Sequence, residues 1–243
     1  MTIANLDSKA LQAKDLLSLL LPKFVLDGMK NYLEMTGETT CYEDVGDVAI
    51  LFCDIADFDD VVRLNENNVV FLLDKIFRKF DDLCVMYGVQ KIETVGKTYM
   101  AAAGIKIADS CLPVDQRDIH PTERVLNLAK AMMRNIKDFD KSLGLKIGIH
   151  IGKPVMGVIG YHKPQFSLIG DAVNTTSRHC TAGKKDHIMV SQAAHDSVSR
   201  QTLLSGLYNY KIMPTEMKGK GKVNVYYLFA GYSVFRTKIL SIS

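Results

Sequence analysis

Apolar residues recur along the chain with two different periods, and these periods predict its secondary structure. A continuous apolar run over residues 48–53 (VAILFC) predicts a buried strand that ends at Asp54. Apolar residues then follow a helical spacing over residues 66–87. Two β-like pieces within residues 89–105 are joined at Gly96–Lys97, and this arrangement predicts a hairpin.

The second half of the chain continues to alternate between helices and strands. Residues 106–120 mix charges without a period and predict a surface loop, whereas a helical pattern begins at Pro121 and stops at Gly144. Residues 145–152 (LKIGIHIG) alternate as a strand does. Further strands are predicted at PVMGVIGY, FSLIG, HIMV and VNVYYLFA. The order β-α-β-β-α-β with extra C-terminal strands predicts an α+β domain built on a ferredoxin-like core.

The chain divides into three expected parts. Residues 1–35 read as a helical lead-in that Pro22 interrupts, because a proline breaks a helix interior. Residues 36–232 form the expected folded domain, and residues 233–243 form a C-terminal tail.

Composition narrows the class of protein. Hydrophobic residues make up 47% of the chain and charged residues 23%, which are ordinary values for a soluble globular domain. The net charge of +3 is too small to indicate a general surface for nucleic acid. The five cysteines have no CxxC spacing, so we expect reduced thiols and no zinc site. No apolar run approaches the roughly 20 residues of a membrane span, so we expect no membrane insertion of this segment.

Polar residues follow three of the predicted strands. Asp54 ends the first strand, Glu93 lies in the hairpin, and Asn174 and Arg178 lie four apart, on one face of the helix after FSLIG. A guanidinium on such a helix suits a phosphate-bearing ligand. A carboxylate at a strand end suits Mg²⁺, but Asp54 could equally cap the next helix, and both interpretations stay open here.

Five motifs together resemble a known family. FCDIADF, KIETVGKTYMAAAG, LKIGIHIGKPVMGVIG, KPQFSLIGDAVNTTSR and KGKGKVNVYYL follow one another in the order and spacing of the class III nucleotidyl cyclase catalytic domain. The segment LLSLLLPKF is similar to the helix and turn that precede this domain in adenylyl and guanylyl cyclases. The resemblance covers nearly the whole chain, from Leu16 to Phe229.

The resemblance implies a dimer of two cyclase domains with the active site at their interface. The implied reaction is attack of the ribose 3′-hydroxyl on the α-phosphate, which expels pyrophosphate with the help of two ions, Mg²⁺ or Mn²⁺. By position, Asp54 matches the first metal aspartate, and the backbone of Ile55 would lie beside that metal.

The same resemblance assigns residues to the nucleotide. Asn174 matches the amide that positions the ribose, and Arg178 matches the guanidinium that stabilises charge developing on the α-phosphate. Either Lys218 or Lys220 matches the lysine that contacts the terminal phosphates.

Two positions bear on the choice of base. In the family, the position of Glu93 holds Lys in adenine-specific enzymes and Glu in guanine-specific ones, and the position of Ser167 often holds Cys or Ser for guanine. Guanine presents N1–H and N2–H donors that one carboxylate can accept together. Glu93 with Ser167 therefore resembles the guanylyl type, with GTP as substrate.

One position departs from the family pattern. The second metal aspartate should follow Gly96, but the chain has Lys97 there, and an ammonium cannot ligate Mg²⁺. The chain thus resembles the purine-binding half of a two-domain cyclase whose partner, a second class III cyclase domain, holds most of the metal. This pairing resembles the guanylyl cyclases of ciliates and apicomplexans, which implies the cytoplasmic side of a larger membrane-bound protein.

Two other hypotheses stay open on the sequence. The chain could be a catalytically silent regulatory module, which the loss of the second aspartate favours and the retention of Glu93, Asn174 and Arg178 opposes. It could also be half of an adenylyl cyclase, with the same mechanism and a different base.

Overall fold

The computed structural model describes residues 21, 25–26, 42–65, 68–160, 165–200, 208–217, 219 and 221–228. The strands are β1 (Tyr42–Asp44), β2 (Val48–Ile55), β3 (Gln90–Val95), β4 (Thr98–Ala103), β5 (Leu145–Gly152), β6 (Val155–Ile159), β7 (Gln165–Ile169), β8 (His187–Ser191), β9 (Tyr210–Met217) and β10 (Gly221–Leu228). The helices are α3 (Phe58–Asn65), α4 (Val69–Met86), α5 (Lys106–Asp109), α6 (Val114–Arg117), α7 (Pro121–Phe139), α8 (Asp171–Ala182) and α9 (Gln192–Ser199).

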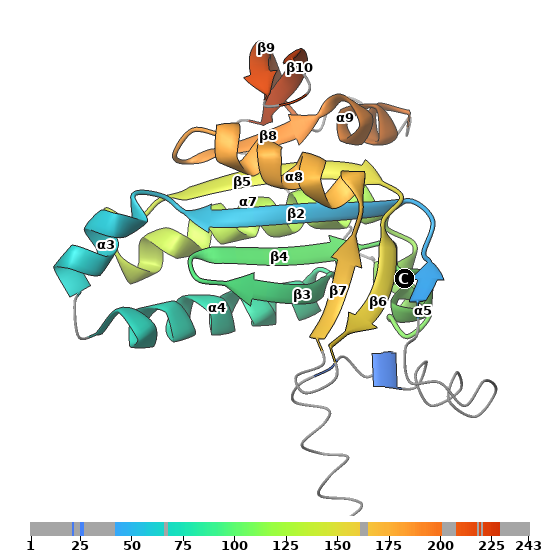
Figure 1. Ribbon diagram of the computed structural model, residues 1–243, viewed down its shortest axis with the longest axis horizontal. Coiled ribbons are helices and arrows are strands. Elements are labelled where there is room, and N and C mark those ends of the chain that lie inside the picture. Colours follow the sequence, from blue (N-terminus) through green and yellow to red (C-terminus); the bar gives the residue numbers. More distant parts are fainter. Residues whose placement is uncertain are drawn as a thin grey trace, which may run out of the picture.

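A seven-stranded sheet with the order β3-β4-β2-β5-β8-β10-β9 forms the centre of the fold (Figure 1). Its first four strands are antiparallel neighbours, and α4 and α7 lie in the two crossovers between them. This is the ferredoxin-like βαββαβ arrangement. Strands β8, β10 and β9 extend the sheet beyond β5, and β8 pairs with β5 in parallel. The predicted α+β fold class with extra C-terminal strands is confirmed.

Strand β2 is buried on both faces, which explains its continuous apolar sequence. Ala49, Leu51 and Cys53 belong to the core that α4 and α7 cover. Val48 and Ile50 belong to a second core on the opposite face. Figure 1 shows this division, with α7 behind the main sheet and α8, β6 and β7 in front of it.

A three-stranded sheet, β1-β6-β7, covers the second core. Met156 and Val158 of β6 and Phe166 and Leu168 of β7 turn their side chains inward against the main sheet. Leu21 and Val25 of the predicted lead-in are buried in the same core, and Leu26 packs against it. The rest of that segment and the tail over residues 233–243 lie outside the described residues, so the domain limits stay a prediction.

The elements differ from the predictions in several places, and strands β1 and β9 were not predicted. The helix predicted over residues 66–87 begins at Val69, and α3 precedes it without having been predicted. The predicted loop over residues 106–120 contains the short helices α5 and α6. The sequence of neither helix shows an apolar period, and tertiary contacts hold this segment in place. Arg124 of α7, almost fully buried, forms an ion pair with Asp109 of α5 and donates to the Gly88 carbonyl at 2.6 Å.

Candidate nucleotide site

An open pocket of about 240 Å³ lies between the main sheet and α8. Three residues of α8 line it: Ser177, Cys180 and Thr181. Two rows of side chains from β3, β4 and β2 also line it, and within each row the residues lie directly opposite one another on neighbouring strands. One row is Val95, Thr98 and Asp54, and the other is Glu93, Met100 and Phe52. The strand register therefore brings two predicted site residues, Asp54 and Glu93, into one pocket.

Glu93 reaches this pocket because β3 contains a bulge. The pairing register between β3 and β4 shifts between Lys91 and Glu93, and Glu93 lies opposite Met100. Without the shift, Glu93 would lie opposite Tyr99, which belongs to the core on the other face of the sheet. The bulge thus turns the Glu93 carboxylate onto the face that carries α8.

Glycines in β5 let α8 lie directly on the sheet. A Cβ built on Gly148 would stand 2.3 Å from the backbone nitrogen of Cys180, and one on Gly152 would stand 2.8 Å from the Cβ of Ala172. Side chains at these two positions would push the helix away. The close approach places the exposed face of α8 beside the pocket.

Asp54 is held by its own neighbours rather than left open. It lies within β2, not beyond its end, and its side chain is 16% exposed. The Thr98 hydroxyl donates to Oδ1 at 2.6 Å, and Nζ of Lys97 lies 3.8 Å from Oδ2. Because Asp54 precedes Ile55 inside the strand, the helix-cap interpretation of Asp54 is wrong: α3 begins at Phe58.

The side chains that the structure describes around Asp54 are not arranged as a cluster of metal ligands. Among the described residues, no group of three or more His, Cys, Asp or Glu side chains is arranged to hold a metal ion. The nearest charged neighbour of Asp54 recorded here is an ammonium, and Mg²⁺ requires oxygen ligands. The amide of Ile55 donates to the Lys97 carbonyl at 3.2 Å, which ties the end of β2 to the turn of the hairpin.

Asn174 and Arg178 lie on the outward face of α8, as their spacing predicts, but neither lines the pocket. Asn174 is exposed and Arg178 is half-buried. A Cβ built on Gly219 would stand 3.7 Å from Nη1 of Arg178, so the turn between β9 and β10 lies against this guanidinium. Lys218 and Lys220 flank Gly219 in sequence, but they lie outside the described residues.

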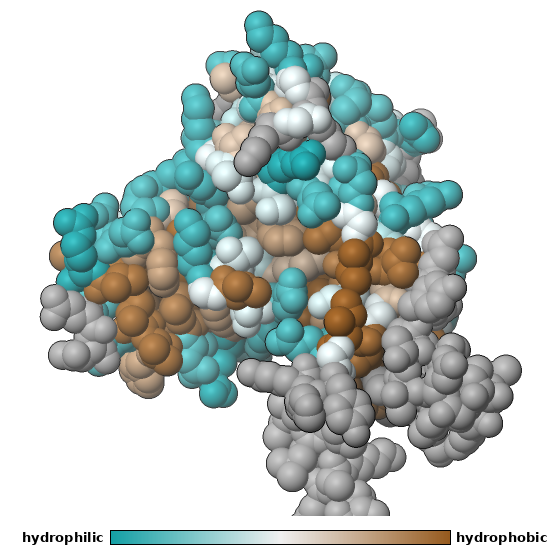
Figure 2. Space-filling view, in the orientation of Figure 1, coloured by the Kyte–Doolittle hydropathy of each residue, from teal (hydrophilic) through white to brown (hydrophobic). Residues whose placement is uncertain are grey.

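Ser167 lies at the centre of the outward face of β7, directly opposite Gly157 of β6. Because Gly157 has no side chain, the position directly opposite Ser167 on β6 does not cover the Ser167 hydroxyl. Apolar residues surround this position: Val155, Ile159 and Ile169 are about half exposed. Figure 2 shows them as an apolar area over β6 and β7. Strand β3, which carries Glu93, runs beside β7.

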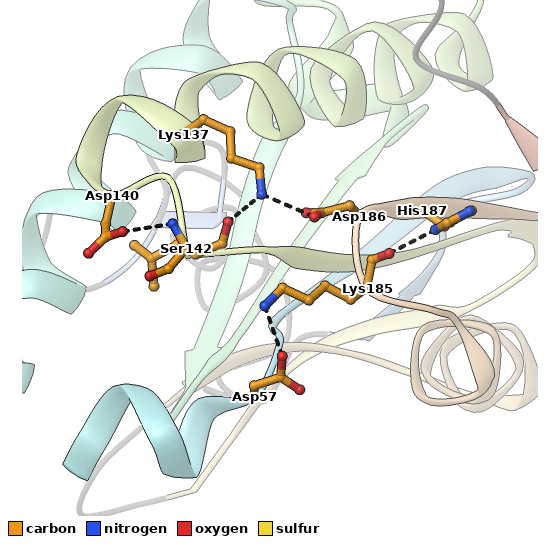
Figure 3. A network of polar contacts seen from close by, with 8 residues as sticks. Asp57, Lys137, Asp140, Ser142, Lys185, Asp186 and His187 are labelled. Atoms are coloured by element: carbon orange, nitrogen blue, oxygen red, sulfur yellow. Dashed lines mark hydrogen bonds and ion pairs between the residues drawn. The ribbon is translucent and has the colours of Figure 1, made fainter. Parts of the chain in front are cut away.

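A network of polar contacts joins three loops at the opposite end of the main sheet from β6 (Figure 3). Lys185 Nζ donates to Oδ2 of Asp57 at 2.9 Å, and this hydrogen bond lowers the pKa of Asp57. Lys137 Nζ donates to the Leu143 carbonyl at 2.6 Å and to Oδ2 of Asp186 at 3.0 Å. The segment after β2 is thereby tied to the loop that leaves α8.

Thiols close to the pocket are buried and protonated at neutral pH. Burial raises the pKa of the Cys180 thiol to about 12, and this thiol donates to the Lys146 carbonyl at 3.2 Å. Burial also raises the pKa of Cys53. The four cysteines that the structure describes are free, as expected, and Cys111 alone among them is exposed.

Sequence reasoning missed three polar residues of the pocket. Thr98, Ser177 and Thr181 line it, and Thr98 also bonds Asp54. Thr98 lies beside Asp54 through the pairing of β2 with β4, because residues directly opposite each other share a face, and the hairpin prediction did not include this pairing. Ser177 and Thr181 share the helical face of Asn174 and Arg178.

The ferredoxin-like sheet with its extra C-terminal strands, and the helix α8 that presents an amide and a guanidinium beside a pocket, agree with the cyclase architecture that the motifs predict. The family model of the adenylate and guanylate cyclase catalytic domain matches residues 41–230. The chain therefore belongs to this family, and the resemblance of its motifs is confirmed.

Relatives of this chain include very long proteins. It is 32% identical to guanylate cyclase beta of Plasmodium falciparum over 88% of this chain and 7% of that protein. It is 28% identical to the guanylate cyclase of Toxoplasma gondii over 92% of this chain and 7% of that protein. Human atrial natriuretic peptide receptor 2 is 32% identical over 93% of this chain and 21% of its own length.

Solved structures share the fold. The guanylate cyclase domain of RhGC from Catenaria anguillulae, solved in complex with GTP, superposes with a TM-score of 0.66 at 27% identity, over 77% of this chain and 98% of that one. The adenylyl cyclase CyaB of P. aeruginosa gives a TM-score of 0.64 at 19% identity, over 78% and 95%. Within the described ranges, no helix has the length and apolar character needed to cross a bilayer.

Proposed function

We propose that this domain is the guanine-binding half of a guanylyl cyclase, which converts GTP to cyclic GMP and pyrophosphate together with a complementary cyclase domain. The position of Glu93 carries the proposal, because its carboxylate lines the pocket beside α8. Relatives named guanylate cyclase, and a similar domain solved with GTP, support the choice of reaction.

Guanine recognition falls to Glu93 and Ser167. A carboxylate accepts both N1–H and N2–H of guanine, whereas adenine offers no such pair of donors. The Ser167 hydroxyl can donate to or accept from the base edge, and the absence of a side chain at Gly157 leaves room for the base. The fit depends on the β3 bulge, which turns Glu93 toward this side of the sheet.

Asn174 and Arg178 act on the ribose and the α-phosphate. The ribose 3′-oxygen forms a bond to the α-phosphorus, the bond from that phosphorus to the bridging oxygen breaks, pyrophosphate leaves and the hydroxyl proton is released. The Arg178 guanidinium stabilises the negative charge that develops on the α-phosphate. The turn at Gly219 lies against Arg178, and we assign Lys218 or Lys220 in this turn to the terminal phosphates.

The partner is a second class III cyclase domain, in a heterodimer or in the same chain. Because Lys97 accompanies Asp54, we assign the Mg²⁺ or Mn²⁺ ions mainly to carboxylates of that partner. The outward apolar face of β6 and β7, with Val155, Ile159 and Ile169, supports a protein partner at this side of the domain. By analogy with the long relatives, we place the domain on the cytoplasmic side of a membrane-bound protein.

Mixing two domains tests the proposal. The isolated chain should be nearly inactive, and addition of a cyclase domain that carries both metal aspartates should give Mn²⁺-dependent formation of cyclic GMP from GTP. Full activity of the isolated chain would contradict this division of labour.

Arg178→Ala in the mixed complex should lower turnover by roughly two orders of magnitude, as loss of a charge-stabilising group does. Arg134→Ala provides the matched control, since Arg134 is exposed on α7, behind the sheet. If Arg178→Ala turned over GTP at the wild-type rate, Arg178 would not belong to the site.

A silent nucleotide-binding module is the second candidate, and the Lys97–Asp54 ion pair favours it. Calorimetry with GTP distinguishes the two. Binding without product, in the presence of a partner that is active with another purine-binding half, would support the silent module and exclude the cyclase.

A further inference from the structure

Both carboxylate oxygens of Asp54 are engaged by the β3–β4 hairpin. Oδ1 accepts from the Thr98 hydroxyl at 2.6 Å, and Oδ2 lies 3.8 Å from Nζ of Lys97. We infer that Lys97 is a resident cation, whose ammonium neutralises Asp54 and keeps divalent metal ions out of this half of the dimer. The proposed function requires only that this chain lack a metal site, whereas the inference names Lys97 as the residue that closes it.

The backbone holds residue 97 close to Asp54. Gly96 has a φ of +56°, which a tight turn requires, and the carbonyl of Lys97 accepts from the Ile55 amide at 3.2 Å. Asp54 pairs directly with Thr98 across the two strands. Residue 97 therefore starts beside the peptide that follows Asp54, and a shorter acidic side chain there would also face this carboxylate.

The charges around this carboxylate favour the ammonium over a metal ion. Lys146 of β5 lies directly opposite Asp54, and Nζ of Lys185 donates a hydrogen bond to Oδ2 of Asp57 at 2.9 Å. A divalent ion at Asp54 would have to displace Lys97 and would be repelled by Lys146, whereas the charge of Lys185 is neutralised by Asp57. It would also meet one carboxylate, whereas Mg²⁺ and Mn²⁺ sites use several oxygen ligands.

The inference has a consequence that rests on the proposed function. If Lys97 alone closes the site, Lys97→Asp supplies the second carboxylate beside Asp54, and two copies of the variant could pair with one another. Each copy would then carry both a metal pair and the residues Glu93, Asn174 and Arg178.

A Mn²⁺ binding experiment tests the inference without nucleotide or partner. Binding is measured as the loss of the electron paramagnetic resonance signal of free Mn²⁺. The wild-type domain should show no saturable binding, and Lys97→Asp should bind at least about tenfold more tightly. Lys97→Asp with Asp54→Asn should lose this binding. Lys211→Asp, an equal change of charge at an exposed position on β9, should behave like the wild type.

A measurement on the wild type keeps the inference testable even if the variant folds poorly. An ion that binds only the native state raises the melting temperature. Since the inference says that the wild type does not bind Mn²⁺ at Asp54, MnCl₂ should leave the melting temperature of the wild type unchanged. A rise that Asp54→Asn abolishes would overturn the inference, as would equal Mn²⁺ affinity of wild type and Lys97→Asp. If these results hold but no partner yields cyclic GMP, the proposed function fails and the inference stands.

Discussion

Gly148 of β5 and Cys180 of α8 are in direct contact through their backbones: a Cβ built on Gly148 would stand 2.3 Å from the Cys180 nitrogen. This contact seats α8 on the sheet, and α8 supplies one wall of the pocket. The helix that carries Asn174 and Arg178 is thus positioned by the absence of a side chain on a neighbouring strand.

Gly148→Ala should therefore destabilise the domain and displace α8. The added methyl group meets backbone, which cannot move away as a flexible side chain can, so we expect a loss of about 1–3 kcal/mol in the free energy of unfolding. Urea unfolding measures it. Gly152→Ala should cost less, because its close neighbour is the Cβ of Ala172 near the start of the helix. Equal stability of wild type and Gly148→Ala would show that α8 is not seated by this contact.

Arg124 and Asp109 should be strongly coupled. The Arg124 side chain is 1% exposed, and it pairs with Asp109, whose side chain is 17% exposed. Asp109→Asn leaves a buried guanidinium without its counter-charge, which should cost about 3–5 kcal/mol in urea unfolding. Asp118→Asn, an exposed position nearby, should change stability by less than about 0.5 kcal/mol.

A second variant separates the charge from the shape of this contact. Combining Asp109→Asn with Arg124→Met removes both partners and should recover part of the stability lost in the single variant. If the double variant were less stable than Asp109→Asn alone, the loss would not come from an uncompensated charge.

The order of elements could be predicted from the sequence because it depends on local periods. The alternating run in β5 and the continuous run in β2 report how each strand is buried, and the structure bears out both. The four-residue spacing of Asn174 and Arg178 predicts a shared outward helical face, and the structure places both on that face of α8. Lys97 was recognised as a departure, but its contact with Asp54 was not predicted.

The assembly of the pocket could not be predicted, because it depends on contacts between distant segments. Glu93 faces the pocket only through the one-residue shift in β3, and a bulge leaves no clear mark in a short strand of mixed polar and apolar residues. Ser177 and Thr181 enter it because Gly148 admits α8. Arg124 holds α5 through Asp109, and Gln116 of α6 donates to the Val85 and Met86 carbonyls. The sequences of these two short helices show no period that would predict them.

Base preference should follow Glu93 and Ser167 in the complex with a metal-binding partner. In the double variant Glu93→Lys with Ser167→Asp, the lysine supplies a donor and the aspartate an acceptor, which match the ring-nitrogen acceptor and the amino donor of adenine. The ratio of GTP to ATP turnover should therefore fall roughly tenfold to a hundredfold. Competition between the two nucleotides measures the ratio. Glu216→Lys, which makes the same Glu-to-Lys change at an exposed position on β9, should leave it unaltered. An unchanged ratio in the double variant would disprove base recognition by these residues.

The thiols should differ sharply in reactivity, because the thiolate is the nucleophile. Burial raises the pKa of Cys180 to about 12, so at pH 8 only about one molecule in ten thousand carries a thiolate there. Burial raises the pKa of the Cys84 thiol to about 12 as well, so Cys84 should react as slowly as Cys180, whereas the exposed Cys111 should be alkylated first. Iodoacetamide followed by mass spectrometry of the digested protein measures each site.

The rate at Cys180 should rise about tenfold per pH unit between pH 8 and 10, provided the fold persists by circular dichroism. Labelling of Cys180 as fast as Cys111 at pH 8 would show that α8 does not stay closed over the sheet.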